Sequence, residues 1–450
     1  MAQTALKHPG TSHLEEAQQA LRARTRRSQQ MASDRAEVIN GAMAASGIAP
    51  PPIFVAKNQG AMFEDLDGNT YLDTCMGFGV HILGHRPPSV ESALRDQLTK
   101  GWHYSLRGED QLAFANMILT ASPANERVVL ANTGTEATLY AIRAARALSG
   151  RTKIALFDIS YHGAHDTALI WPGPGSTAEQ LAPMTLGHGI PDCVVSDVLL
   201  LPYRSPRALE QIAEHAHELA AVLVEPVQGS WPEAEVGEFL QALRSLCDDL
   251  GLILIFDEVL TGFRLDFGGA QKRYGVEADL TTYGKIAGGG LPIGVVAGRA
   301  NLMAAFSDFT GPHGIFFGGT FSGNPMSVAA GLAALQTLRA DPEIYRRIGR
   351  LADRVRDEFN TFCVGQGYPP RIKSCGSMWQ VFFRDEPLGG FDYAGKEAEG
   401  AFYLHCLNMG VFIHATHRCF FSAAHTEADA DRVIAVFKAA LELVREDGLL

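Results

Sequence analysis

The chain has 450 residues, 46% of them hydrophobic, and its 50 acidic and 38 basic side chains give a formal net charge of −12. This length allows two or more domains around a large core. The acidic balance argues against nucleic acid or an anionic membrane as the main partner, because both bind basic patches.

The first 99 residues are expected to form a helix followed by a small-domain hairpin. Residues 13–45 are rich in Glu, Gln, Arg and Ala and predict a helix, which the three prolines at 50–52 end because proline cannot continue it. The stretch GAMFEDLDGNTYLD, residues 60–73, then predicts a β-hairpin with its turn at 67–69.

Residues 100–335 follow a different pattern, in which short apolar runs alternate with segments of helical periodicity. The runs are RVVLA, KIALF, DVLLL, AAVLV, LILIF and IGVVAG. Such alternation predicts an α/β domain with a mostly parallel sheet covered by helices on both faces. Residues 336–450 combine a long charged helix, the strand-like SMWQVFF and GVFIHA, and a last helix from Glu427. This pattern indicates a smaller α+β domain.

The seven cysteines are scattered, without a C-x-x-C pair or a zinc-like His/Cys spacing. The first residues lack the apolar run of a signal peptide, and no apolar segment approaches the roughly 18 residues that a membrane helix needs. We therefore expect a cytoplasmic protein that acts on small molecules, with no metal site, no membrane partner and no nucleic-acid partner.

In a parallel sheet, ligands bind at the carboxyl ends of the strands. After RVVLA, Gly134 and Thr135 stand at a helix start, where free N–H groups and the helix dipole suit a phosphate. An ordinary capped helix is the alternative there. After KIALF, Tyr161 beside His162 could stack on a flat ring, or could simply lie in the core or a loop.

The run LILIF delivers Asp257 to the same edge, where a buried carboxylate needs a cationic or protonated partner. A magnesium ion in a nucleotide-hydrolysing module is one candidate. That module requires G-x-x-x-x-G-K-[ST], which is absent, and GGGLPIG lacks the dinucleotide-binding spacing. A protonated pyridine nitrogen is the other candidate.

Lys285 lies in TTYGKIAGGG, after a strand-like segment and before glycines that allow backbone to approach a ligand closely. In such a low-charge place the pKa of a lysine is depressed, so that it forms a Schiff base with an aldehyde. Pyridoxal 5'-phosphate would place its aldehyde on Lys285, its ring nitrogen at Asp257, its ring against Tyr161 and its phosphate at the 134–135 helix start. We therefore predict this cofactor. A catalytically silent protein of the same fold is the alternative, and the presence of Lys285 and Asp257 argues against it.

Further motifs join these: GNTYLD, ILGH, NTGTEATLYAIRAAR, VEPV, FDEVLTGFRL, GGTFSGNP and AHTEADADR. From about residue 60 to its end, the sequence resembles the class III, fold-type I pyridoxal-phosphate aminotransferases, and within them glutamate-1-semialdehyde aminomutase. The resemblance implies a seven-stranded, mostly parallel sheet in the large domain. It also implies that Lys285 is the Schiff-base lysine and that Asp257 binds the ring nitrogen, which would make these the two catalytic residues.

The resemblance adds three cofactor-binding residues to Gly134, Thr135, Tyr161 and His162. Val259 would pack on the second ring face, and Glu225 of VEPV would lie near the cofactor. Thr320 of GGTFSGNP matches a threonine that reaches the phosphate of the partner subunit, which implies a homodimer with shared sites.

The substrate side departs from the aminomutase pattern. The Ser-Trp pair before ILGH is replaced by a Gly-Phe pair ending at Phe78, and a Glu-Ala-Gly-Phe segment is replaced by HRCF at 417–420. Phe78, His417 and Arg418 are therefore candidate substrate residues. A substrate carboxylate would need a cation, for which Arg418, Arg264 and Arg107 are the candidates. Any of the three could equally sit in a structural ion pair, an alternative that applies most to Arg264.

We therefore expect an aminotransferase that moves an amino group, through a Lys285 Schiff base, between an amine or amino-acid donor and a separate carbonyl acceptor. The alternative is intramolecular amino transfer of the glutamate-1-semialdehyde 2,1-aminomutase type, in which both halves of the reaction act on one molecule.

Overall fold

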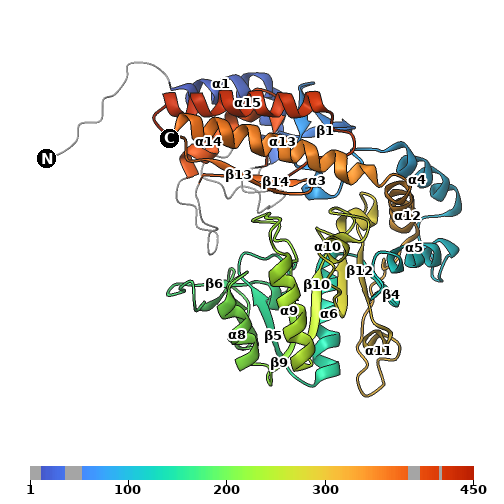
Figure 1. The fold of residues 1–450 in the computed structure, drawn as a ribbon. Coiled ribbons are helices and arrows are strands. Elements are labelled where there is room, and N and C mark those ends of the chain that lie inside the picture. Colours follow the sequence, from blue (N-terminus) through green and yellow to red (C-terminus); the bar gives the residue numbers. More distant parts are fainter. Residues whose placement is uncertain (1–11, 36–52, 384–395, 415–417) are drawn as a thin grey trace.

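The computed structural model describes residues 12–35, 53–383, 396–414 and 418–450. In Figure 1 a large sheet and its helices occupy the lower part, and helices from both ends of the described chain occupy the upper part. Helix α1 (His13–Arg24) contacts α14 (Lys396–Asn408) and α15 (Glu427–Glu446). The two ends of the chain therefore fold together.

The large sheet has seven strands in the order β4, β12, β11, β10, β9, β5, β8. Strand β12 runs antiparallel to both neighbours, and the other six run in one direction. In chain order the strands are β4 (Arg127–Ala131), β5 (Lys153–Phe157), β8 (Val198–Leu201), β9 (Leu219–Val224), β10 (Ile253–Asp257), β11 (Leu280–Tyr283) and β12 (Gly294–Gly298). The predicted α/β fold with a mostly parallel seven-stranded sheet is confirmed.

Helices cover both faces of this sheet because successive side chains of a strand point to opposite faces. All residues of β9 are buried. Leu223 packs in one cluster with α6 (Gly134–Ser149), whereas Val222 packs in another with α9 (Gly237–Leu250). The further helices around the sheet are α7 (Asp192–Ser196), α8 (Pro206–Glu214), α10 (Gly269–Tyr274) and α11 (Ala300–Met303), with the 3-10 turns η2 (Asp166–Ala168), η3 (Lys285–Gly288) and η4 (Ala304–Phe306).

The predicted hairpin at 60–73 is confirmed. It belongs to a four-stranded sheet of β1 (Val55–Gln59), β2 (Met62–Asp65), β3 (Thr70–Asp73) and β15 (Val411–Phe412). At the turn, the backbone N–H groups of Asp67 and Asn69 donate to Oδ1 of Asp65 at 2.9 and 2.8 Å. Strand β15 pairs in parallel with β3, so segments more than 300 residues apart in the chain share one sheet.

A third sheet holds β13 (Arg371–Cys375), β14 (Met378–Phe382) and β16 (Cys419–Phe420). The long helices α13 (Glu343–Gln366) and α15 pack against each other in this region, and both were expected from the sequence. The predicted division into 1–99, 100–335 and 336–450 stays a prediction. The β3–β15 pairing joins residues of its first and third segments.

The helix predicted over 13–45 is two helices within the described residues, α1 and α2 (Arg26–Arg35). Thr25 separates them, and its hydroxyl donates to the carbonyl of Leu21 at 2.7 Å. Residues 36–45 and the prolines at 50–52 lie outside the described part of the chain. The other helices are α3 (Met76–Gly79), α4 (Pro88–Lys100), α5 (Glu109–Leu119) and α12 (Pro325–Ala340).

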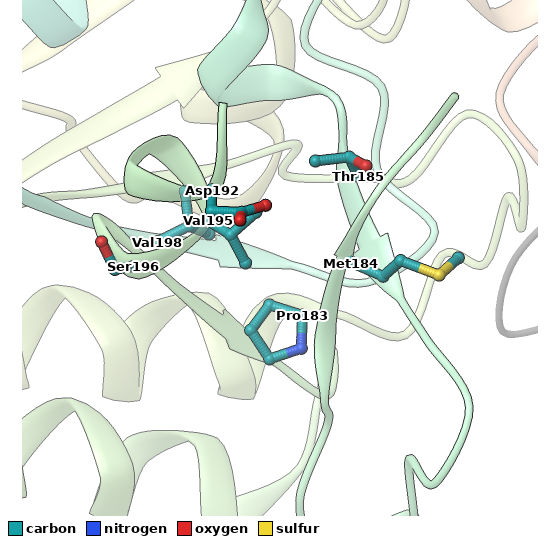
Figure 2. A pocket seen from close by; sticks show the side chains of 7 residues that line it. All are labelled: Pro183, Met184, Thr185, Asp192, Val195, Ser196 and Val198. Atoms are coloured by element: carbon teal, nitrogen blue, oxygen red, sulfur yellow. The ribbon is translucent and has the colours of Figure 1, made fainter. Parts of the chain in front are cut away.

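An antiparallel ribbon of β6 (Ile170–Pro172) and β7 (Pro183–Thr185) stands beside β8 and forms an open depression with α7. Figure 2 shows its lining, with Met184 on the ribbon and Asp192 on α7. Val198, the first residue of β8, also lines it. The depression therefore lies by the amino end of that strand and contains none of the predicted site residues.

Among the described residues, no helix is both long enough and apolar enough to cross a membrane. The same residues contain no cluster of three or more His, Cys, Asp or Glu side chains arranged to hold a metal ion.

Candidate active site

Five predicted site segments follow the carboxyl ends of parallel strands of the large sheet. Gly134 follows β4, Tyr161 follows β5, Glu225 follows β9, Asp257 ends β10 and Lys285 follows β11. Because these strands run in one direction, all five residues lie at the same edge of the sheet. The structure therefore brings together residues that are up to about 150 positions apart in the chain.

Lys285 begins the 3-10 turn η3 with a left-handed backbone, φ +44°. Burial and, after it, the Arg418 cation lower the pKa of its amine to about 8, while Asp257 and Glu225 oppose the shift. This is the direction expected from the sequence. Above about pH 8, most of Lys285 is therefore a neutral amine able to act as nucleophile or base.

The glycines after Lys285 were expected to let backbone approach a ligand. In the structure, the middle glycine, Gly289, lets a helix approach closely. A Cβ at Gly289 would lie 2.2 Å from the carbonyl oxygen of Ala330 in α12, and one at Gly331 would lie 2.1 Å from the carbonyl oxygen of Ala287. This close contact of η3 with α12 fixes the turn that carries Lys285.

Asp257 is buried and accepts three hydrogen bonds. Its Oδ2 lies 2.7 Å from Nδ1 of His162, and its Oδ1 accepts from the backbone N–H of Val259 at 3.0 Å and from the hydroxyl of Thr282 at 3.1 Å. A carboxylate has about four acceptor sites, so one remains for a further donor such as a protonated ring nitrogen. Glu258, the next residue, points elsewhere, because its carboxylate accepts from the backbone N–H groups of Ala270 and Gln271.

Helix α6 begins at Gly134, with Thr133 as its N-cap, so the capped-helix interpretation is correct. The N-cap hydroxyl accepts from the N–H of Glu136 at 3.1 Å. That cap leaves the N–H groups of Gly134 and Thr135, the first two of the helix, without an intrahelical acceptor. A helix start can therefore be capped and still bind an anion through these N–H groups. A Cβ at Gly134 would lie 2.9 Å from Cγ1 of Val259, so only glycine allows this loop to lie against β10.

Tyr161 has 47% of its side chain exposed, at the edge where the strands end, so its ring face is accessible to a flat ligand. Glu225 is buried. Burial raises the pKa of its carboxyl group, and the neighbouring His162 and Arg418 oppose that rise. The carboxyl group of Glu225 therefore lies within electrostatic reach of both His162 and Arg418.

The residues at the strand ends form one wall of the site. Segments outside the large sheet form the second wall. The guanidinium of Arg418 donates to the hydroxyl of Ser230 at 2.7 Å, and burial lowers its pKa against the opposing charge of Glu225. A Cβ at Gly229 would lie 2.9 Å from Cζ of Arg418, so glycine at 229 allows the guanidinium to lie on the backbone. His417 lies outside the described residues.

Phe78 has a left-handed backbone, φ +59°, and its ring lies 5.3 Å from that of His414 in an edge-to-face arrangement. The loop that carries Phe78 is held by Arg264. This buried guanidinium donates to the carbonyls of Leu260 and Gly79 and to the hydroxyl of Ser377. The ion-pair interpretation of Arg264 is therefore wrong, because its described hydrogen-bond acceptors are oxygen atoms without charge and its guanidinium lies over the ring of Phe420.

Thr320 is exposed, on a loop between η4 and α12. A Cβ at its neighbour Gly319 would lie 2.6 Å from Nδ2 of Asn132, two residues before the start of α6. The loop thus lies beside the start of α6 in its own chain, where the cofactor phosphate is expected. Which subunit's site Thr320 serves stays a prediction.

Sequence reasoning missed Thr282, which donates to Asp257 and could have been noticed as a hydroxyl in a strand whose residues are all buried. Residues 228–230 stand out in the sequence as a departure from the aminomutase pattern on the substrate side. The contacts of Gly229 and Ser230 with Arg418 could not be foreseen, because Arg418 lies 188 residues beyond Ser230 in the chain.

The residues of this edge fit pyridoxal phosphate. They provide an amine of lowered pKa, a buried carboxylate with an acceptor site left, a helix start with free N–H groups and an accessible aromatic face, all at the carboxyl ends of parallel strands of one sheet. Each matches one chemical group of that cofactor.

The fold is that of a fold-type I pyridoxal-phosphate enzyme. Residues 43–441 match the family described as Aminotransferase class-III. The chain belongs to this family, whose members use pyridoxal 5'-phosphate.

The chain is 38% identical over 410 residues to the glutamate-1-semialdehyde 2,1-aminomutase of Rhodopirellula baltica, a match that covers 89% of this chain and 91% of that one. Among solved structures it is similar to an omega-transaminase from Sphaerobacter thermophilus, with a TM-score of 0.83, 31% identity and coverage of 97% and 98% of the two chains. It is also similar to a beta-phenylalanine aminotransferase from Variovorax paradoxus, with a TM-score of 0.82, 31% identity and coverage of 95% and 96%.

Proposed function

We propose that this enzyme transfers an amino group on a substrate that carries a carboxylate, and that Arg418 binds the carboxylate. The observation that carries the proposal is the Arg418 guanidinium, seated on Gly229 and donating to Ser230 while its charge acts on Lys285. A cation that lowers the pKa of the reacting amine lies close enough to bind one end of a small substrate whose other end reaches that amine.

Pyridoxal phosphate, when bound, supplies an electron sink for negative charge on the substrate carbon that bears the nitrogen. Lys285 would hold the cofactor and, as a neutral amine, remove the proton from that carbon. Asp257 would hold the proton on the ring nitrogen. The first N–H groups of α6 would bind the phosphate, and Tyr161 and Val259 would enclose the ring.

Two reaction types fit this arrangement. The curated relatives support the single-compound, aminomutase type more directly than the two-compound type expected from the sequence. The second wall favours two compounds, because Phe78 and Arg418 replace the aminomutase residues there. The similarity to solved structures of two transaminases, each at 31% identity, is consistent with the two-compound type.

The deciding experiment supplies the pyridoxamine form of the enzyme with glutamate-1-semialdehyde alone and measures 5-aminolevulinate. Efficient conversion establishes the aminomutase type and refutes the two-compound type. No conversion, combined with turnover of a donor amine only when a carbonyl acceptor is added, establishes the aminotransferase with ping-pong kinetics.

We also propose that the enzyme is a homodimer in the cytoplasm. In support, His103 and Phe321 lie with their rings 5.4 Å apart, which joins two segments rich in exposed apolar side chains. These side chains are Trp102, Leu106, Leu112, Phe316 and Phe321. An exposed apolar surface of this kind is typical of a subunit interface. Light scattering of the purified protein gives the oligomeric state.

A further inference from the structure

Ser230, which accepts the hydrogen bond of Arg418, lies in the loop between β9 and α9, and the next residue of that loop is Trp231. The side chain of Trp231 is buried. Its ring centre lies 4.3 Å from that of Phe382 in β14 and 4.4 Å from Nζ of Lys373 in β13. Trp231 therefore joins this loop to the sheet of β13, β14 and β16.

The two contacts of Trp231 come from one face of that sheet. Lys373 of β13 lies opposite Gln380 of β14, and Phe382 follows Gln380 by two residues, so it points to the same face. An aromatic ring that packs on a second ring and also receives an ammonium group on its face gains from both contacts. The position of the Trp231 ring is therefore fixed by two different kinds of interaction.

Glu233, two residues after Trp231, holds the same loop a second time. Its carboxylate forms ion pairs with Lys373 and with Arg204, which follows β8. All three charged side chains of this group are partly buried. Lys373 is thus held between the carboxylate of Glu233 and the ring of Trp231, and the loop is tied to β13 at both residues.

Arg418 is tied to the same sheet from the other side. It comes directly before β16, which pairs with β14. Ser230 comes directly before Trp231, whose ring packs on Phe382 of β14. Strand β14 therefore supports both partners of the 2.7 Å hydrogen bond from Arg418 to Ser230. A shift of the Trp231 ring would move the hydroxyl of Ser230 away from the guanidinium that it orients.

We propose that Trp231 is a positioning residue that sets the preference of the enzyme for substrates with a carboxylate. It holds Ser230 in place, and Ser230 orients the guanidinium of Arg418 toward the substrate carboxylate. The proposal rests on the function proposed above for Arg418. Because a hydrogen bond weakens steeply when its donor is misaligned, a small shift of the guanidinium is enough to change the preference.

The test uses probes that do not depend on the identity of the natural substrate. Aminooxyacetate and 3-aminooxypropionate carry a carboxylate, and O-ethylhydroxylamine and O-propylhydroxylamine are their uncharged counterparts. All four react through their amino group with the aldehyde of bound pyridoxal phosphate, which absorbance follows. The ratio of rate constants within each pair measures the carboxylate preference, which should be about 10- to 100-fold for at least one pair in the wild-type enzyme.

Trp231→Leu should lower this preference by about 3- to 10-fold and leave the rate constants of the uncharged probes nearly unchanged. Trp231→Phe is the matched control, because it keeps an aromatic ring against Phe382 and Lys373 and should keep most of the preference. If Trp231→Leu does not fold, Phe382→Leu removes the ring on which Trp231 packs and should give the same selective loss.

A double variant shows whether Trp231 acts through Arg418. In the Arg418→Met background, Trp231→Leu should cause no further loss of preference, because the guanidinium that Trp231 positions is absent. A loss of equal size in the wild-type and Arg418→Met backgrounds overturns the positioning role.

Arg418→Met alone separates this proposal from the function on which it rests. If the wild type shows no preference, or if Arg418→Met keeps it in full, the carboxylate role of Arg418 fails and the positioning role fails with it. If Arg418→Met loses the preference while Trp231→Leu and Phe382→Leu keep it, only the positioning role is overturned. Equal losses for charged and uncharged probes in these two leucine variants also overturn it, because a purely structural role predicts them. A selective loss there, with the preference kept in Trp231→Phe, supports it.

Discussion

The two walls of the candidate site are built in different ways. The cofactor wall takes its residues from the ends of parallel strands, with Gly134, Asp257 and Lys285 each placed by its own strand. The substrate wall takes Phe78 and Arg418 from the two ends of the chain, outside the large sheet. One wall is therefore fixed by a regular sheet, whereas the other depends on contacts between distant segments, which allows the substrate to change while the cofactor chemistry stays the same.

The largest effect is expected at the cofactor wall. Lys285→Ala should reduce turnover by more than about 10⁴-fold, because it removes both the covalent attachment and the base. Borohydride reduction followed by mass spectrometry should label Lys285 in the wild type and no lysine in the variant. Labelling of another lysine in the wild type would contradict the assignment.

Asp257→Asn should lower turnover by about 10²- to 10⁴-fold while the cofactor still binds, because an amide cannot hold the ring nitrogen protonated. Thr282→Val is the matched variant, since it removes one donor to the same carboxylate and should cost about tenfold at most. Turnover and the cofactor dissociation constant check both. Near-normal turnover of Asp257→Asn would remove the aspartate from the mechanism.

At the substrate wall we expect a selective effect. Arg418→Met should lower kcat/KM for carboxylate-bearing substrates by about 10- to 100-fold and leave uncharged amines nearly unchanged, because only the charged hydrogen bond is lost. Ser230→Ala, which removes the anchor of the guanidinium but keeps its charge, should give a smaller loss. Equal losses for charged and uncharged amines in Arg418→Met would mean that Arg418 supports the fold and does not bind substrate.

The charge of Arg418, on the substrate wall, acts on the amine of Lys285, on the cofactor wall. The pH dependence of cofactor capture therefore measures the coupling between the two walls. Lys285 of the apoenzyme, with a pKa of about 8, should capture pyridoxal phosphate faster as pH rises and reach a plateau above that pKa. Arg418 lowers the pKa of this amine, so Arg418→Met should move the midpoint to higher pH. Stopped-flow absorbance across pH measures both. An unchanged midpoint would show that the guanidinium does not act on the amine.

The smallest effect is expected at Thr320. Thr320→Ala should weaken cofactor binding by about 3- to 10-fold, the value of one hydrogen bond. Mixed dimers of Lys285→Ala with Thr320→Ala chains decide which site Thr320 serves. One site with wild-type cofactor binding in such dimers indicates that Thr320 serves the neighbouring subunit, whereas half the activity of the Thr320→Ala homodimer, from one weakened site instead of two, indicates service within its own chain.

Much of the cofactor wall could be predicted because its signals are local. An apolar run ended by a polar residue marks both a strand and the point where it delivers a side chain, as for Asp257 after LILIF and Lys285 after β11. The hairpin at 60–73 was predictable for the same reason, since its turn residues are adjacent in the chain.

The sequence alone also determined the family, the helix starts and the presence of a lysine able to react with an aldehyde. Only the tertiary structure decided what those residues touch. It gave the contact of His162 with Asp257, 95 residues apart, and that of Arg418 with Ser230, 188 residues apart. It also showed that Gly289, in the glycine run after Lys285, packs closely on α12. The physical reason is that periodicity and turn chemistry act over a few residues, whereas hydrogen bonds and close contacts depend on which segments the folded core brings together.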